Sequence, residues 1–218
     1  MFEVKNISMI YDMDTDARTY ALKGFDLSLP DKGMVGIIGP SGSGKSTLMY
    51  CLSTLKKPTE GSVDYNGTEL TSISGSERER LRRKEFGFIF QKHYLVPYMS
   101  AMDNCLVAAV EKGPAVQKKA EDFLQELGLG KKEWSKKPSK LSGGQCQRVA
   151  IARAMINDPG VIFADEPTAS LDHESAYNVM KILKKYSDER LVLVVTHDRS
   201  ILEDADRIIE MWDGEISR

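Results

Sequence analysis

The stretch Gly39-Pro40-Ser41-Gly42-Ser43-Gly44-Lys45-Ser46-Thr47 lies between an apolar run, Met34–Ile38, and a segment with few helix breakers, Thr47–Leu52. Its spacing, G-x-x-x-x-G-K-S, is typical of loops that bind phosphate. A strand, a glycine-rich turn and a helix start would aim backbone N–H groups and the positive end of the helix dipole at an anion. Lys45 can then reach the β- and γ-phosphates of ATP, and Ser46 can offer its hydroxyl to Mg²⁺. The alternative is an ordinary glycine- and serine-rich turn with a chance lysine.

The composition is that of a globular protein with a sizeable core. The chain has 218 residues, of which 41% are hydrophobic and 28% charged, enough for one large domain or two small ones. Thirty Lys and Arg against 32 Asp and Glu leave a net charge of −2, so bulk charge gives no reason to expect nucleic-acid binding. Apolar runs are too short to span a bilayer, and Met1–Lys5 lacks the features of a signal peptide, so we expect a cytosolic chain.

Strand and helix signals predict an α/β fold with three parts. Phe2–Met9 and Ala21–Leu29 form an N-terminal antiparallel β layer, and short apolar runs such as Leu191–Val195 form a mainly parallel core sheet. Strand signals nearly vanish from Tyr94 to Lys137, where Ala115–Leu129 has the apolar spacing of a helix. We therefore expect a single domain, 1–218, in which a helical subdomain at about 93–157 is inserted into a core made of 1–92 and 158–218.

Two carboxylates follow a second apolar run. Val161–Ala164 predicts a strand, and Asp165 and Glu166 come directly after it, at the end of the strand where ligands lie in open α/β sheets. The first carboxylate can hold Mg²⁺, and the second can polarise a water for attack on the γ-phosphate. Without the phosphate-binding loop, a strand that merely leaves the core into solvent would explain the pair equally well.

The segment Leu141-Ser142-Gly143-Gly144-Gln145 predicts a second anion site by the same physics as the first, because Ser142 can cap a helix that begins there. One ATP does not need two phosphate cradles from one chain. Two chains arranged head to tail, each lending its segment to the other's nucleotide, would use both. Taken alone, the segment is also compatible with an ordinary capped helix.

Together these motifs resemble the ATP-binding subunit of an ABC transporter, over essentially the whole chain. They occur in that family's order: the P-loop, Gln91 after a strand, the signature Leu141–Gln145, the Walker B run Val161–Glu166, the D-loop Ser170-Leu171-Asp172, and His197 after a strand. Two stretches, Gly87–Gln91 and Arg207–Ile216, resemble the subgroup that serves macrolide, lipoprotein and antimicrobial-peptide exporters. The resemblance implies the fold of a P-loop NTPase and Mg²⁺-dependent hydrolysis of ATP.

The resemblance also implies roles for individual residues. Tyr11 would stack on the adenine, although a lone aromatic at a strand end more often packs. Glu166 would be the general base, Gln91 would contact Mg²⁺ or the attacking water, and His197 would contact the γ-phosphate. Lys45 would hold phosphates during catalysis; Ser46 and Asp165 would join Gln91 at the metal. Asp172 would organise the dimer interface.

One departure from the family pattern concerns Cys146, just after the signature, where relatives commonly have another polar residue. A thiol near a helix N-terminus can have a lowered pKa, which would make it sensitive to oxidation; a tolerated spacer is the alternative. Three cysteines without metal-ligand spacing predict free thiols. His93 and His173 fit no motif and are expected at the surface.

The function that follows is an ATPase that powers a membrane exporter from the cytoplasmic face, through ATP-driven closure of a dimer. The loop from Gln91 to Asn104 has unusual apolar character, so we expect the permease to dock there, unless the loop is simply buried. A regulatory ATPase that signals through a membrane protein would carry the same motifs. Soluble relatives that act on DNA or ribosomes usually have a long coiled coil or a second ATPase domain, and neither is present in this sequence.

Overall fold

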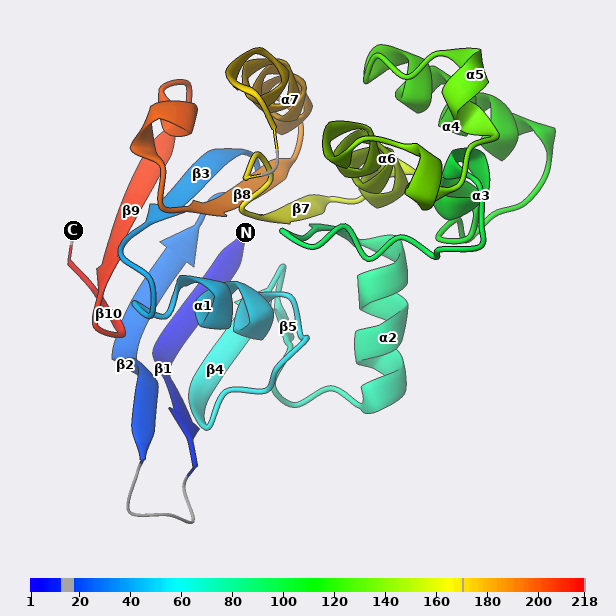
Figure 1. The fold of residues 1–218 in the computed structure, drawn as a ribbon. Coiled ribbons are helices and arrows are strands. Elements are labelled where there is room, and N and C mark those ends of the chain that lie inside the picture. Colours follow the sequence, from blue (N-terminus) through cyan, green and yellow to red (C-terminus); the bar gives the residue numbers. More distant parts are fainter. Residues whose placement is uncertain (13–17, 170, 218) are drawn as a thin grey trace.

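The computed structural model describes residues 1–12, 18–169 and 171–217 and contains two β-sheets with helices beside them (Figure 1). The N-terminal sheet is antiparallel, with the strand order β2-β1-β4-β5. Its strands are β1 Phe2–Tyr11, β2 Thr19–Leu29, β4 Glu60–Tyr65 and β5 Thr68–Glu69. The predicted antiparallel layer is confirmed, and the loop predicted between its first two strands falls largely outside the described residues.

The second sheet has the order β10-β9-β3-β8-β7-β6, and only β10 runs antiparallel to its neighbour. The predicted, mainly parallel core is therefore confirmed. A final hairpin turns at Asp213-Gly214, where Glu215 pairs with Trp212. The strands are β3 Gly33–Ile38, β6 Phe86–Ile89, β7 Val161–Asp165, β8 Leu191–Thr196, β9 Arg207–Trp212 and β10 Glu215–Ile216.

Serine caps begin three of the helices. Ser74, Ser100 and Ser142 each accept a hydrogen bond from the backbone N–H three residues on, and the residue there bonds back, which satisfies two otherwise free donors. The helices α3 to α6 lie together on one side of the molecule (Figure 1). The helical elements are α1 Lys45–Leu52, α2 Gly75–Lys84, α3 Ala101–Leu106, α4 Pro114–Glu126, α5 Lys131–Trp134, η1 Pro138–Lys140, α6 Gly143–Met155, α7 His173–Ser187 and η2 Arg199–Leu202.

The core sheet is covered on both faces, which explains its continuous apolar strands. Along β7 and β8, alternate residues join two different clusters. Phe163 and Leu193 pack with the N-terminal sheet and α1, whereas Ile162 and Val194 pack with the helices on the other face. Within residues 1–12, 18–169 and 171–217, no helix is both long and apolar enough to cross a membrane.

Candidate nucleotide site

The P-loop connects the end of β3 to the start of α1, and its glycines fit where a side chain would not. Gly44 has φ 96°, and a Cβ there would lie 2.3 Å from the carbonyl oxygen of Ala21. A Cβ at Gly39 would lie 2.1 Å from the carbonyl oxygen of Met211. The loop is therefore pressed against strands of both sheets, and only glycine allows the backbone to approach so closely.

Lys45 spans the loop that it follows. Its Nζ donates to the carbonyl oxygens of Gly39 and Pro40, both at 2.8 Å, and the residue is 8% exposed. Burial lowers the pKa of Lys45, while the nearby carboxylates of Glu166 and Asp165 act in the opposite direction. The ammonium thus lies across the loop and near two carboxylates. From this position its positive charge can bind a phosphate.

Asp165 accepts hydrogen bonds from two hydroxyl groups on one face of α1. Ser46 Oγ lies 3.1 Å from its Oδ1, and the hydroxyl of Tyr50 lies 3.3 Å from its Oδ2. Burial raises the pKa of Asp165, and these two hydrogen bonds oppose that rise. Carboxylate and hydroxyl oxygens are the ligands that Mg²⁺ prefers, so this donor set fits the metal. Sequence reasoning missed Tyr50, although its i,i+4 spacing from Ser46 places both on one helical face.

Glu166 is held in a left-handed backbone conformation, with φ 50°. Its carboxylate accepts hydrogen bonds from Thr196 Oγ1 at 3.0 Å and from the N–H of His197 at 3.0 Å. His197 Nδ1 lies 2.6 Å from Glu166 Oε1 and must donate to a carboxylate; its side chain is 70% exposed. With Nδ1 so engaged, the ring can donate from Nε2 as well only in its protonated form.

Strand register explains why these residues meet. In the parallel sheet Ile38 pairs with Thr196 and Asp165 pairs with Val195, so the P-loop, the acidic pair and His197 all follow the same carboxyl edge. Gln91 also leaves this edge, because Ile89 pairs with Ala164, and it is exposed. Tyr11 lies at the end of β1, where Lys56 Nζ is 4.5 Å from its ring centroid.

The signature is exposed and separate from the P-loop of its own chain. Ser142 and Gly143 are exposed, and Ser142 and Gln145 cap each other at the start of α6. Among described residues, no hydrogen bond, ion pair or ring contact joins 141–145 to 39–47. The D-loop residue Ser170 lies outside the described residues, whereas Asp172 caps α7 through the N–H of Ser175.

Residues 22–169, more than half of the chain, match the ABC transporter family. The chain belongs to the ABC transporter family. It is 45% identical to the lipoprotein-releasing system ATP-binding protein LolD of Aquifex aeolicus, covering 89% of this chain and 88% of that protein. It is 44% identical to the macrolide export ATP-binding/permease protein MacB of Neisseria meningitidis, over 99% of this chain. The cassette spans only 34% of that MacB protein.

A solved structure carries the same fold. It is a dimeric ATP-binding cassette in a post-hydrolysis state bound to ADP and Pi, 38% identical, with a TM-score of 0.93 over 100% of this chain and 97% of that one. The predicted family, subgroup and fold are thereby confirmed. The cassette binds and hydrolyses ATP, as predicted, and the similar solved cassettes are dimers.

For Cys146 the structure favours the tolerated spacer over the activated thiol, and the surface position expected for His93 was wrong. Burial raises the pKa of the Cys146 thiol, whose Sγ lies 3.6 Å from the carbonyl oxygen of Pro138, so the helix terminus does not activate it. His93 is half-buried rather than a surface residue, and burial followed by the charge of Arg153 lowers its pKa. His173 is exposed as expected. The three cysteines are free thiols, as predicted, and all three are buried.

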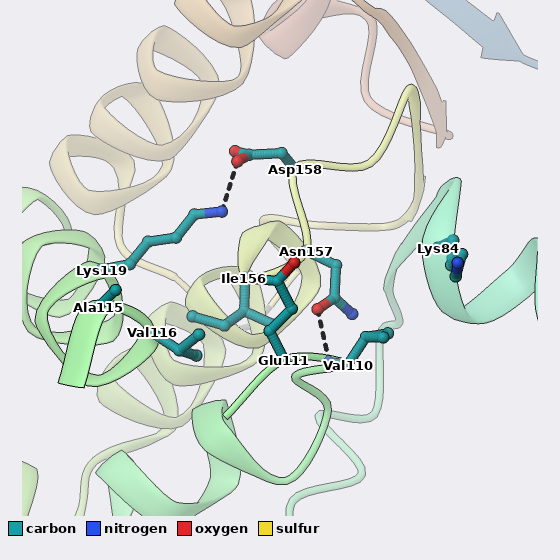
Figure 2. Close-up of a pocket in the computed structure, with 9 residues that line it drawn as sticks. All are labelled: Lys84, Val110, Glu111, Ala115, Val116, Lys119, Ile156, Asn157 and Asp158. Carbon is teal, nitrogen blue, oxygen red and sulfur yellow. Dashed lines mark hydrogen bonds and ion pairs between the residues drawn. The ribbon is translucent and has the colours of Figure 1, made fainter. Parts of the chain in front are cut away.

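A hollow of about 370 Å³ lies away from this chemistry (Figure 2). Inside it, Lys119 reaches Asp158, and the side chain of Asn157 accepts from the N–H of Val110. Its nine lining residues include none from the P-loop, the acidic pair or the signature. The candidate nucleotide site lies instead at the carboxyl edge of the parallel sheet.

Proposed function

We propose that this cassette is the ATP-hydrolysing subunit of a membrane exporter and that two copies close head to tail around two ATP molecules. The observation that carries the proposal is the capped signature, in which Ser142 and Gly143 are exposed and the helix start has the geometry of an anion site. Among the described residues, the signature makes no hydrogen bond or ion pair to the phosphate loop of its own chain. A second copy would supply a phosphate loop. The dimeric cassettes to which this chain is similar support the arrangement.

In this proposal Glu166 is the general base. Three donors, from Thr196 and His197, orient its carboxylate, which would take a proton from the water that attacks the γ-phosphate. Lys45 and the P-loop backbone, Gly39–Thr47, would hold the phosphates and balance charge as it builds up. His197 would contact the γ-phosphate, while Gln91, at the same sheet edge, would order the water. Tyr11 would pack on the adenine.

Mg²⁺ would be held by Ser46 and Asp165, with Gln91 nearby, because their oxygen atoms suit a hard cation. When bound, the ion neutralises phosphate charge. Tyr50 would orient the Asp165 carboxylate through its hydroxyl, and such partners of metal ligands affect affinity strongly.

A test of the shared site mixes two inactive chains. Ser142→Ala damages the signature and Glu166→Gln removes the base, so homodimers of either variant should turn over slowly. In a mixed dimer one composite site retains both intact residues, so we expect up to about half of the wild-type rate in that species. The measurement is ATP turnover against mixing ratio. Strictly additive activities of the two homodimers would reject the head-to-tail site.

The permease, in our proposal, docks beside the loop from Gln91 to Asn104. Tyr94 and Tyr98 are 65% and 73% exposed, whereas Leu95 packs on the helical core, so the loop is only partly buried. Asn104 stiffens it through its side-chain amide, which bonds to Val96, Met99 and Ser100. A stiff loop with exposed aromatic side chains suits a partner that must push on it.

A groove of about 390 Å³ adjoins this loop. It has both basic and apolar lining, contributed by Arg82, Arg83, Phe90, Tyr94, Val107 and Arg153, among others. A short helix with apolar and acidic side chains from a membrane subunit would complement it. Residues 93–157 would then move as the helical subdomain, and the cassette would work on the cytoplasmic face of the membrane.

Val107→Asp should abolish docking without harming the isolated cassette, because Val107 is half-exposed and lies in the groove. We expect the variant to lose co-purification with its co-expressed permease and to lose permease-dependent stimulation of ATP turnover, while its basal turnover is unchanged. Tyr177→Ala, which removes an exposed aromatic ring on α7 instead, is the matched control. Normal stimulation of the Val107→Asp variant would place docking elsewhere.

A further inference from the structure

Gln147 lies in the second turn of α6, directly after the signature, and is 2% exposed. Its Nε2 donates to the carbonyl oxygen of Pro167 at 2.7 Å. Because a carbonyl only accepts, the amide nitrogen must face it. Among the described residues, no group bonds to the buried Oε1 of Gln147. Among the residues that the structure describes, the bond to Pro167 is therefore the hydrogen bond that compensates for burying this side-chain amide.

Pro167 follows Glu166, the residue with the unusual backbone. A left-handed conformation at a residue with a side chain is strained and persists only where the surroundings hold it. The N–H of Glu166 donates to the carbonyl oxygen of Val195 at 2.8 Å, which holds one side of the residue. On the other side, the carbonyl oxygen of Glu166 accepts from the N–H of Ala169 at 3.3 Å, and the bond from Gln147 anchors the intervening residue, Pro167.

The same helix contacts this segment a second time. A Cβ added at Gly144 would lie 3.1 Å from Leu171 Cδ2, so the start of α6 lies against the chain that leaves the acidic pair. Pro167 and Leu171 are thus both contacted by α6.

We propose that Gln147 is a positioning residue for the Glu166 of its own chain, acting through the backbone of Pro167. Gln147 is buried, so it would act through Pro167 and would fix Glu166 relative to the helix whose first turn carries the signature. The proposal rests on the role of Glu166 in the proposed function. It predicts that loss of the amide lowers turnover at constant ATP affinity, since Lys45 and the P-loop are unaffected.

The test uses dimers of two differently tagged chains, of which one carries Glu166→Gln so that a single Glu166 remains active. Gln147→Leu is placed either in the chain with the intact Glu166 or in the other chain. In the first position we expect kcat to fall roughly 10- to 100-fold, as for a slightly misplaced catalytic group, with KM for ATP nearly unchanged. In the second position we expect turnover close to that of the reference dimer.

Equal losses in both positions would reject the inference, because general damage to α6 would also reach the signature; absence of any loss would reject it too. Gln117→Leu, at an exposed site on α4, is the matched control, and Gln147→Met serves if the leucine variant does not fold. Ser142→Ala in the chain lacking Glu166 tests the shared site separately. If that change leaves turnover intact, the head-to-tail site fails, whatever Gln147 does.

Discussion

Glu166→Gln is expected to lower ATP turnover by about 10²–10⁴-fold, the contribution of a well-placed general base. The amide keeps the shape of the side chain and retains an oxygen that can accept from Thr196 or His197, so the fold should persist. ATP should still bind, because Lys45 and the P-loop are intact. Turnover measured with saturating ATP, together with dimer mass in the presence of ATP, checks both halves of the prediction.

The control for this variant is Glu79→Gln, which removes an exposed carboxylate on α2 and should leave turnover unchanged. A Glu166→Gln protein with wild-type turnover would show that another group accepts the proton. A protein that neither hydrolyses nor binds ATP would show that Glu166 supports the fold of the site rather than the chemical step.

Lys45→Ala is expected to weaken ATP binding by about 100-fold, since hydrogen bonds to charged groups contribute about 1.5–3 kcal/mol and factors of ten correspond to 1.4 kcal/mol. The buried ammonium also balances the negative charges of Asp165 and Glu166. Without it, these two carboxylates would repel the phosphates of ATP. Calorimetric titration with ATP gives the affinity. The expected result is a large loss of ATP affinity.

Lys32→Ala removes an exposed lysine in the turn before β3 and serves as the control for charge alone. If Lys45→Ala bound ATP as tightly as the wild type, the P-loop assignment of Gly39–Thr47 would be wrong.

The local motifs of the cassette could be predicted because each depends on neighbouring residues. Each motif occupies only a few consecutive positions: the glycines of the P-loop, the capping serine of the signature, and the carboxylates after an apolar run. The strands and helices near them were found for the same reason. Burial decided what the local pattern left open or misjudged. His93 is half-buried, and its carbonyl oxygen accepts from Arg153. Burial against Pro138 decides between the two alternatives for the Cys146 thiol.

The residues that support the site were missed because their partners are far away in sequence. Tyr50 meets Asp165 across 115 positions, and Gln147 meets Pro167 across 20. Nothing in the local pattern around either residue distinguishes it from a helical residue that packs in the core. Only the placement of α1 and α6 against the acidic segment reveals the hydrogen bonds.

By itself, the sequence determined which chemistry the chain carries: a phosphate loop, an acidic pair and a second anion-binding helix start, each a short-range pattern of backbone and side-chain groups. The tertiary structure decided how those parts relate. Strand register brings the P-loop, Asp165, Glu166 and His197 to one edge, whereas the signature begins a separate helix, where Ser142 and Gly143 are exposed. That separation arises because packing of α6 on the core, not sequence order, sets where its first turn can face.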